Sequence, residues 1–355
     1  MSEVIQTRPR KMVRRRLMLT ASSAALVVFA PSANADDNSS QPTVWIELGG
    51  AFDQISRGSV DWVPPNLTDP ITNASPKPFG AAPNIGYDFD GAISIQPNGS
   101  DWIFTASMRY GRAQHGPKDT HDQGYGVGTL ASAGLTNYAF LNATQQSHST
   151  HAVLDFTAGR DVGMGLLSSG LSTIHFGVRA TQLNENATAH FSAFSSAPAK
   201  YSAGKIVHKA DALFARSFSG AGPSVSWDGA TPLMGSVDGG VTFDWGANAA
   251  ILVGRQKAHI SLHTADTRYA GKYQYPKIPI VLAQSTVTPD RDRTVVVPNL
   301  GGFAGVSWRL PAGKISMGYR ADFFFGALDG GLTTSRKNTT GFYGPFASVS
   351  IGLGG

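Results

Sequence analysis

The sequence predicts an all-β protein, a transmembrane antiparallel β-barrel of about ten strands, within a range of about eight to twelve. Three observations predict this fold. Stretches of about a dozen residues alternate apolar and polar side chains, the connections between them alternate between short and long, and the chain begins with an export signal. An outer-membrane barrel has short periplasmic turns and long extracellular loops, whereas a β-sandwich has no reason to sort its connections by length.

The first segment, residues 1–35, is predicted to be a cleaved signal peptide. Six basic residues precede an apolar run over Leu17–Ala30, and Ala33 and Ala35 supply the small residues that a signal peptidase accepts. The run is too short to cross a bilayer comfortably as a retained anchor. Residues 36–355 are therefore expected to form the outer-membrane β-barrel, placed in the cell outer membrane of a Gram-negative bacterium after export.

Removal of this segment changes the charge of the protein. The chain holds 29 Lys and Arg and 24 Asp and Glu, of which six basic residues and one acidic residue lie in residues 1–35, so 23 of each remain. The mature protein is formally neutral, and its composition predicts no nucleic-acid partner. The chain has no cysteine, which excludes disulfide scaffolds and thiolate metal sites. Beyond residue 35 no apolar run is long enough for a membrane helix.

Strands are predicted wherever apolar side chains recur at every second position. From Tyr87 to Ile95, for example, mostly apolar residues alternate with polar or small ones, so one face suits lipid and the other water. The sixth strand has the least regular alternation, because Arg216 lies among apolar neighbours. In chain order, the predicted strands are 43–56, 85–96, 101–112, 150–161, 171–185, 210–227, 236–256, 296–309, 314–326 and 341–354.

The connections fall into two classes. Short ones contain turn-forming residues near positions 97–100, 163–170, 228–235 and 311–313, and they alternate with tracts of roughly 15 to 40 residues. An even number of strands returns both chain ends to the periplasmic rim. Tryptophans on the strands predict an aromatic girdle at the level of the lipid headgroups, since their rings are apolar with one polar edge. These are Trp45, Trp102, Trp227, Trp245 and Trp308.

The long tracts carry few chemical motifs. Residues 57–84 are rich in proline, which disfavours further sheet. Residues 113–149 contain several histidines, but their spacing matches no ligand pattern, so the sequence predicts no metal site there. Glycines between Gly124 and Gly128 resemble a phosphate-binding loop only superficially, because no strand precedes them, no helix follows and no Lys-Ser or Lys-Thr pair is present. We interpret this segment as flexible backbone, and no cofactor is expected.

Enzymatic barrels require an aspartate pair, or a histidine with a serine and an acid, near the outer rim. The residues available for such a site are Asp53, Asp88, His151, Asp155, His175 and Asp322. Their spacing singles out no triad, and any water-facing barrel interior needs polar residues. The sequence therefore predicts no catalytic residue and no enzyme.

From about residue 210 onward, the chain resembles a known family on several short segments. These are Phe218–Pro223, Asp228–Gly229, Pro232–Leu233, Gly254–Lys257, Gly318–Asp322, Leu328–Gly331, Gly341–Phe346 and Ser350–Gly354. They are similar to segments of the Legionella major outer membrane protein family, a group of pore-forming outer-membrane barrels. The resemblance covers roughly the last 40 percent of the chain. It implies a barrel, an outer-membrane location and a porin role, and it carries over no catalytic residue.

Function then depends on whether the interior conducts. About ten strands leave little space inside, so any pore is expected to be narrow. The candidate pore-lining residues are Glu47, Asp88, Arg109, Asp155, Arg179, Asp244, Arg320 and Asp322. In a channel, both signs of charge would orient or filter small solutes; in a plugged barrel they would pair and close it. The sequence leaves both alternatives open: a narrow porin for passive diffusion of small solutes or ions, or a non-conducting surface barrel whose long extracellular loops serve adhesion or structure.

The predicted surroundings and partners follow from the fold class. Outer-membrane lipid and lipopolysaccharide would cover the barrel surface, and the barrel-assembly machinery with periplasmic chaperones would act in biogenesis. A homo-oligomer is left open by the sequence.

Overall fold

The computed structural model describes most of the chain beyond residue 42. It covers residues 43–57, 84–120, 125–130, 134–162, 171–195, 205–235, 240–269, 279–310, 313–331 and 334–353. The expected signal peptide with Ala33 and Ala35 lies outside these ranges, as does most of the proline-rich tract. Within them, no helix is long and apolar enough to cross a membrane.

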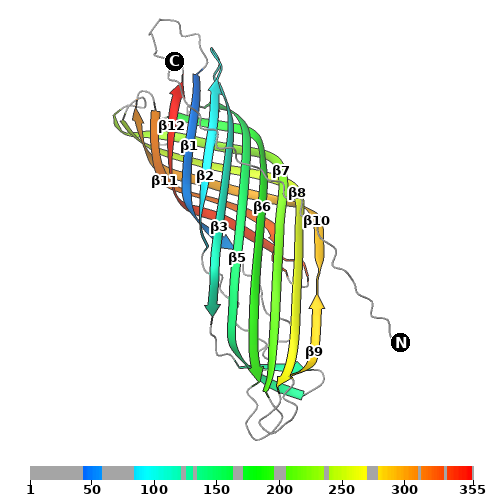
Figure 1. Ribbon diagram of the computed structural model, residues 1–355. Helices are drawn as coiled ribbons and strands as arrows, with labels where there is room; N and C mark the ends of the chain where they lie inside the picture. The colour runs from blue at the N-terminus through cyan, green and yellow to red at the C-terminus, as the bar shows by residue number, and fades with distance from the viewer. Residues whose placement is uncertain are drawn as a thin grey trace, which may run out of the picture. The chain divides into compact units, whose positions relative to one another are not determined.

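Ten strands form a closed antiparallel barrel, which confirms the predicted fold class (Figure 1). Around the ring they follow the order β10-β11-β12-β1-β2-β3-β5-β6-β7-β8, and pairing of β8 with β10 completes it. Their bounds are β1 Thr43–Arg57, β2 Asn84–Gln96, β3 Trp102–Thr120, β5 Gly134–Asp161, β6 Leu171–Ser195, β7 Lys205–Gly235, β8 Gly240–Tyr269, β10 Asp290–Leu310, β11 Gly313–Asp329 and β12 Lys337–Leu353. Each of the ten predicted strands corresponds to one of these.

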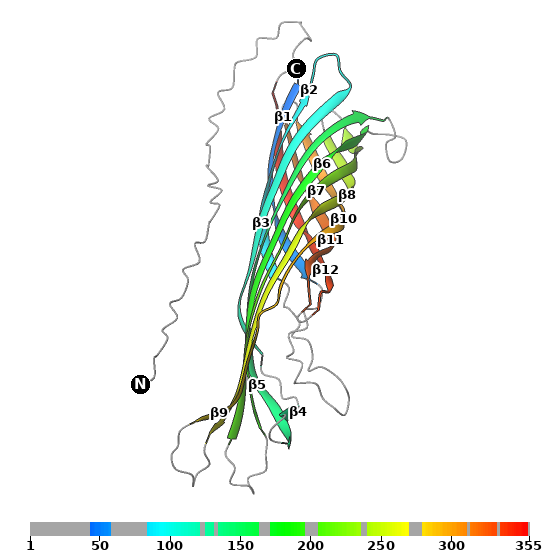
Figure 2. The same ribbon diagram turned by 90° about the vertical axis from the view of Figure 1, so that its right-hand side faces the viewer.

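The strands of one half of the barrel run far past the other half. Strands β5 to β8 are 28, 25, 31 and 30 residues long, whereas about 9 to 11 residues cross a bilayer. Two further strands, β4 (Tyr125–Leu130) and β9 (Ile280–Val287), pair with β5 and β8 at the far end of this extension (Figure 2). We call the part of β5 to β8 beyond the barrel, together with β4 and β9, the projecting sheet.

The projecting sheet corrects the expectation of long irregular loops. Most of the tract 113–149 is strand, and the glycine-rich segment that we interpreted as flexible forms β4. The prediction failed because polar residues occupy the outward positions of the extended strands, so the apolar–polar alternation that indicates a strand is lost there. On β6, Leu183 and Ala187 face the buried side, but Asn186 and His190 occupy the outward positions. Backbone hydrogen bonds continue the sheet where the hydrophobic signal ends.

Four short connections between barrel strands lie at the same rim as the two ends of the described barrel. We call it the short-turn rim; it carries the connections β2–β3, β5–β6, β7–β8 and β10–β11. The β2–β3 turn is closed by a hydrogen bond from the Ser100 N–H to the Pro97 carbonyl, and Gly99 has a φ of 67°, which a side chain would disfavour. The opposite rim bears the projecting sheet. The predicted order of short and long connections is thus present, but β-sheet takes the place of much of the predicted long loops.

An apolar band surrounds the outside of the barrel. Large hydrophobic side chains that are exposed to the surroundings include Leu48, Phe52, Phe89, Phe104, Met108, Phe156, Phe176, Ile251, Val296, Leu300, Met317 and Val349. On β6 the outward positions change from Phe176 and Val178 to Gln182 and Asn186 toward the projecting sheet. Exposed apolar surface of this extent suits lipid, and the polar positions beyond it suit water.

Four of the five predicted girdle tryptophans lie on the outer face. Trp102, Trp227 and Trp308 are exposed outward in the half of the barrel nearest the short-turn rim, and Trp245 packs edge-on against Trp227 at 5.0 Å between ring centroids. Trp45 departs from the prediction because it faces inward. It lies two positions from inward-facing Glu47 on β1, on the same face of the strand, and packs against inward-facing Gly352. A tryptophan at a strand end predicts a girdle only if its position also points outward.

Candidate functional site in the barrel interior

All eight candidate pore-lining residues point into the barrel. Seven of them, all but Asp88, line an interior cavity of about 380 Å³ that lies in the half nearest the short-turn rim. Asp88 is buried beyond this cavity. Near the short-turn rim, Asp244 accepts hydrogen bonds from Ser307 at 2.7 Å and Thr242 at 2.7 Å and pairs with Lys314 at 3.2 Å. The interior is therefore polar on this side, with acceptors and donors already paired with one another.

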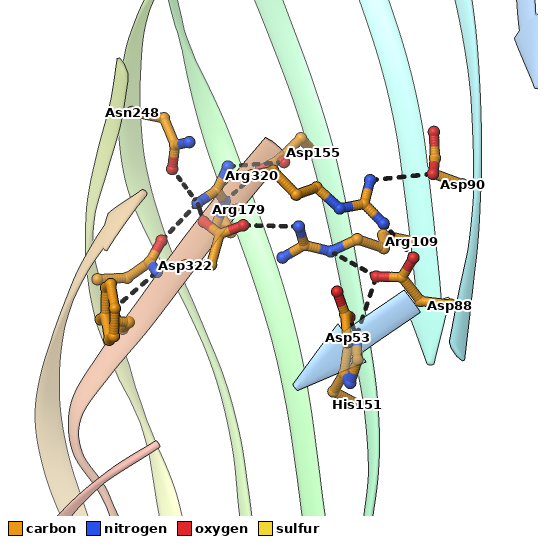
Figure 3. A network of polar contacts seen from close by, with 12 residues as sticks. Asp53, Asp88, Asp90, Arg109, His151, Asp155, Arg179, Asn248, Arg320 and Asp322 are labelled. Carbon is orange, nitrogen blue, oxygen red and sulfur yellow. Dashed lines mark hydrogen bonds and ion pairs between the residues drawn. The ribbon is translucent and has the colours of Figure 1, made fainter. Parts of the chain in front are cut away.

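Arg179 is the centre of the interior contacts. Its Nε and Nη2 donate to both carboxylate oxygens of Asp155, at 2.7 Å and 2.9 Å. Its Nη1 donates to the side-chain oxygen of Asn248 at 2.7 Å and to that of Asn299. Such paired hydrogen bonds between guanidinium and carboxylate are among the strongest in proteins. One arginine on β6 thus connects to β5, β8 and β10 (Figure 3).

Two further arginines connect strands from distant parts of the ring. Nη1 of Arg109 on β3 donates to Asp322 on β11 at 2.6 Å. Arg320 on β11 donates to Asp90 on β2 at 3.0 Å and also to Asp88. Strands β3 and β11 are separated by β12, β1 and β2, so these contacts cross the lumen and do not follow the wall. We call the three arginines with Asp88, Asp90, Asp155 and Asp322 the ion-pair layer.

An apolar layer lies directly beyond the ion-pair layer, toward the projecting sheet. On β11 Phe324 is the next inward residue after Asp322, and on β1 Ile55 follows Asp53. The layer draws on every barrel strand except β2, and its members are at most 5% exposed. They are Ile55, Ala113, Val153, Leu183, Phe218, Ala250, Leu252, Val297, Phe324, Ala327, Leu328 and Phe342. An open lumen would leave inward side chains in contact with water.

Three residues considered for catalysis come together at the boundary of the two layers. Asp53, Asp88 and His151 lie on β1, β2 and β5, and their side chains are at most 3% exposed. No substrate can reach a trio so deeply buried, which argues against a catalytic role. The other candidate acids and His175 lie elsewhere: Asp155 and Asp322 belong to the ion-pair layer, and His175 approaches Asp228 at 3.6 Å.

Sequence reasoning missed several members of this interior. Asp90, Asn248 and Asn299 each accept a hydrogen bond from an arginine, and all three occupy inward positions of their strands. The inward parity of each strand was readable from the sequence, and these residues share it. The partners across the lumen were not readable, because they depend on which strands face each other in the closed ring.

Comparisons with known proteins returned distant likenesses to solved structures. A scan against protein-family models found no match, and neither did a search of curated proteins. The structure is similar to a deletion mutant of the monoaromatic hydrocarbon channel TodX, with 11% identity, 92% of each chain covered and a TM-score of 0.29. It is also similar to the translocator domain of the autotransporter NalP from Neisseria meningitidis, with 11% identity, 89% and 90% coverage and a TM-score of 0.19. Likenesses this distant carry no inference about what this chain does.

Proposed function

We propose that the protein is an outer-membrane barrel with a closed interior, which anchors the projecting sheet at the cell surface for a structural or adhesive role. The observation that carries this proposal is the set of contacts across the lumen. Arg109, Arg179 and Arg320 each reach non-neighbouring strands, and the apolar layer lies directly behind them. Ions crossing the barrel would have to break charge-assisted hydrogen bonds and then enter an apolar layer.

The projecting sheet supports the second half of the proposal. At about 3.3 Å per residue, the 31 residues of β7 extend for roughly 100 Å, and about 11 of them are needed to cross the bilayer. The remainder carries polar residues such as Lys209 and Asp211, together with exposed Leu213, on its outward face, and it would stand in the aqueous medium outside the cell. A conducting pore needs no such structure, whereas a surface protein gains an extended face from it.

Electrical recording tests the closed interior. Purified protein in planar bilayers is expected to show no discrete current steps at any voltage, whereas a triple variant, R179S/F218A/F324A, removes the central arginine and two large apolar side chains and is expected to conduct. The triple variant also controls for insertion, because its steps show that the preparation enters the bilayer. Discrete steps from the unmodified protein would contradict the proposal.

The absence of cysteine allows a direct test of location and orientation. Asn186→Cys places a thiol on the outward face of the projecting sheet, and Ser100→Cys places one in the β2–β3 turn. In intact cells, a membrane-impermeant maleimide is expected to label the first variant and to leave the second unlabelled until the outer membrane is permeabilised. Labelling of Ser100→Cys alone would reverse the proposed orientation.

A narrow porin is the second candidate, and the interior cavity favours it. The cavity of about 380 Å³ holds both signs of charge, as a filter for small solutes would. For this function, the contacts of Arg179 and the apolar layer would have to move aside during conduction. Brief steps that change ion preference in Arg109→Glu would support the porin over the closed barrel.

Membership of the Legionella major outer membrane protein family also stands as a proposal. The segments Gly318–Asp322 and Gly341–Phe346 support it; they lie on β11 and β12, where Arg320, Asp322 and Phe342 contribute to the interior layers. We further propose outer-membrane lipid and lipopolysaccharide as the surroundings of the apolar band, with assembly machinery and periplasmic chaperones as biogenesis partners. Heat-modifiable migration of the protein extracted from isolated outer membranes would test this placement.

A further inference from the structure

Three potential metal ligands meet inside the barrel where the ion-pair layer adjoins the apolar layer. Each of Asp53, Asp88 and His151 offers one ligand atom, and these atoms all lie within 4.8 Å of one another. The three residues come from β1, β2 and β5, so the closed sheet brings them together and no sequence motif does. Figure 3 shows the His151 ring beneath the two carboxylates.

The facing atoms have one other charged neighbour, because Nε of Arg109 lies 3.9 Å from Oδ2 of Asp88. Nε2 of His151 lies 3.6 Å from Oδ2 of Asp88 and 3.8 Å from Oδ2 of Asp53, and none of these three atoms has a hydrogen-bond partner within the described part of the chain. Hydrogen bonds between such atoms are about 2.7 to 3.2 Å long, so these separations are too long. Ligand atoms around a tetrahedral zinc ion, with bonds of about 2.0 to 2.1 Å, lie about 3.4 Å apart, which is close to the separations seen.

The histidine is held in place by its neighbours. Gly111 on β3 pairs with both Asp88 and His151, and a Cβ on this glycine would lie only 2.2 Å from the imidazole Cε1. Because Gly111 has no side chain, the ring can extend over β3 toward Asp88. On the other side, the ring of Phe342 packs against it, with 4.0 Å between centroids. A rotamer fixed in this way presents Nε2 to the two carboxylates.

The charges of the region leave a deficit that a dication would balance. The ion-pair layer and the trio together hold five carboxylates, those of Asp53, Asp88, Asp90, Asp155 and Asp322, and three guanidiniums. When all five carboxylates are ionised and the imidazole is neutral, this set of groups carries two negative charges in excess. Arg320 donates to Oδ1 of Asp88, so Oδ2 of that residue remains directed toward the trio. Buried carboxylates without partners are costly, and cation binding relieves that cost.

We propose that Asp53, Asp88 and His151 bind one divalent first-row transition metal ion of the zinc class. One imidazole nitrogen with two carboxylate oxygens suits such an ion better than Ca²⁺ or Mg²⁺, which favour all-oxygen sites. The ion would enter as the strands assemble, because the finished site is closed to solvent, and it would then tie β1, β2 and β5 together. The proposal does not depend on whether the lumen conducts.

Metal loading during refolding tests the site. The mature protein without a histidine tag is refolded into detergent micelles with Zn²⁺ or Cu²⁺, freed of unbound ion and analysed for metal content. One ion per chain is expected, and the Cu²⁺ form is expected to show electron paramagnetic resonance splitting from a single nitrogen. His151→Gln and Asp53→Asn are expected to lower the affinity at least about tenfold.

His190 supplies the matched control. It also pairs with an aspartate, Asp211 at 2.7 Å, but both side chains are largely exposed on the projecting sheet. His190→Gln is expected to leave the stoichiometry and the spectrum unchanged. Refolded protein without bound metal, or metal binding that survives His151→Gln, would overturn the proposal. Should the variants not fold, the single-nitrogen splitting of the unmodified protein decides alone, and a spectrum without nitrogen splitting rejects the site.

Discussion

Replacing Arg179 with methionine should destabilise the barrel strongly. The change removes four hydrogen bonds, two to Asp155 and one each to Asn248 and Asn299. At about 1.5 to 3 kcal/mol for a hydrogen bond to a charged group, the gross loss is about 6 to 12 kcal/mol. Water in the adjoining cavity can hydrate the partly exposed Asp155 carboxylate and recover part of it. We therefore expect the free energy of unfolding to fall by about 3 to 5 kcal/mol, the range for breaking a buried ion pair.

The measurement is urea unfolding in lipid vesicles, followed by tryptophan fluorescence, with Arg160→Met as the matched control. Arg160 pairs with Asp101 at 3.0 Å, but their side chains are 57% and 73% exposed, so its loss should cost less than about 1 kcal/mol. A double variant, R179M/D155L, should recover part of the stability because it leaves no unpaired carboxylate. Equal costs for Arg179→Met and Arg160→Met would refute the structural role of the ion-pair layer.

Three further predictions concern the apolar layer, the apolar band and one buried acid. Phe324→Ala removes a fully buried ring, and its expected cost of about 3 to 5 kcal/mol is measurable by the same unfolding assay. Phe176→Arg in the apolar band should lower the free energy of unfolding by about 2 to 4 kcal/mol in vesicles, whereas Asn186→Arg on the projecting sheet should change it little. Similar losses for both variants would contradict the assignment of Phe176, and not Asn186, to the lipid-facing surface. Burial opposes a lower pKa for Asp329, but hydrogen bonds from backbone N–H groups, such as that of Arg336 at 2.9 Å, and from a guanidinium hold it below 3.8. Its stabilisation is therefore complete above pH 3.8 and lost as the pH falls below it, and Asp329→Asn should remove that dependence from unfolding curves.

The fold could be predicted from the sequence because each strand of the barrel wall alternates apolar and polar side chains, a pattern that can be read locally. Phe176 and Val178 against Arg179 already show which side of β6 meets lipid. The projecting sheet could not be predicted, since its outward residues, such as Asn186 and His190, carry no apolar signal. Apolar–polar alternation indicates whether the two faces of a strand contact different environments, and a strand with water on its outward face can lack it.

The candidate site was predictable only in part. Inward parity placed Arg109, Arg179 and Asp322 correctly in the interior, but their pairing depends on the closed ring, because Arg109 and Asp322 are 213 positions apart. The trio was accessible to sequence reasoning only as separate residues. Gly111 permits His151 to approach Asp88, but a single glycine in a strand does not by itself predict such a contact.

The contacts across the lumen also constrain the order in which the protein assembles. Arg320 lies near the end of the chain and reaches Asp88 and Asp90 near its beginning, and the first and last strands meet along a seam of backbone pairs from Val44 to Arg57. Neither contact can form until the final hairpin is in place. Until then the guanidinium of Arg320 lacks both of these carboxylate partners. The contacts between the first and last parts of the chain are thus completed only at the closure of the ring.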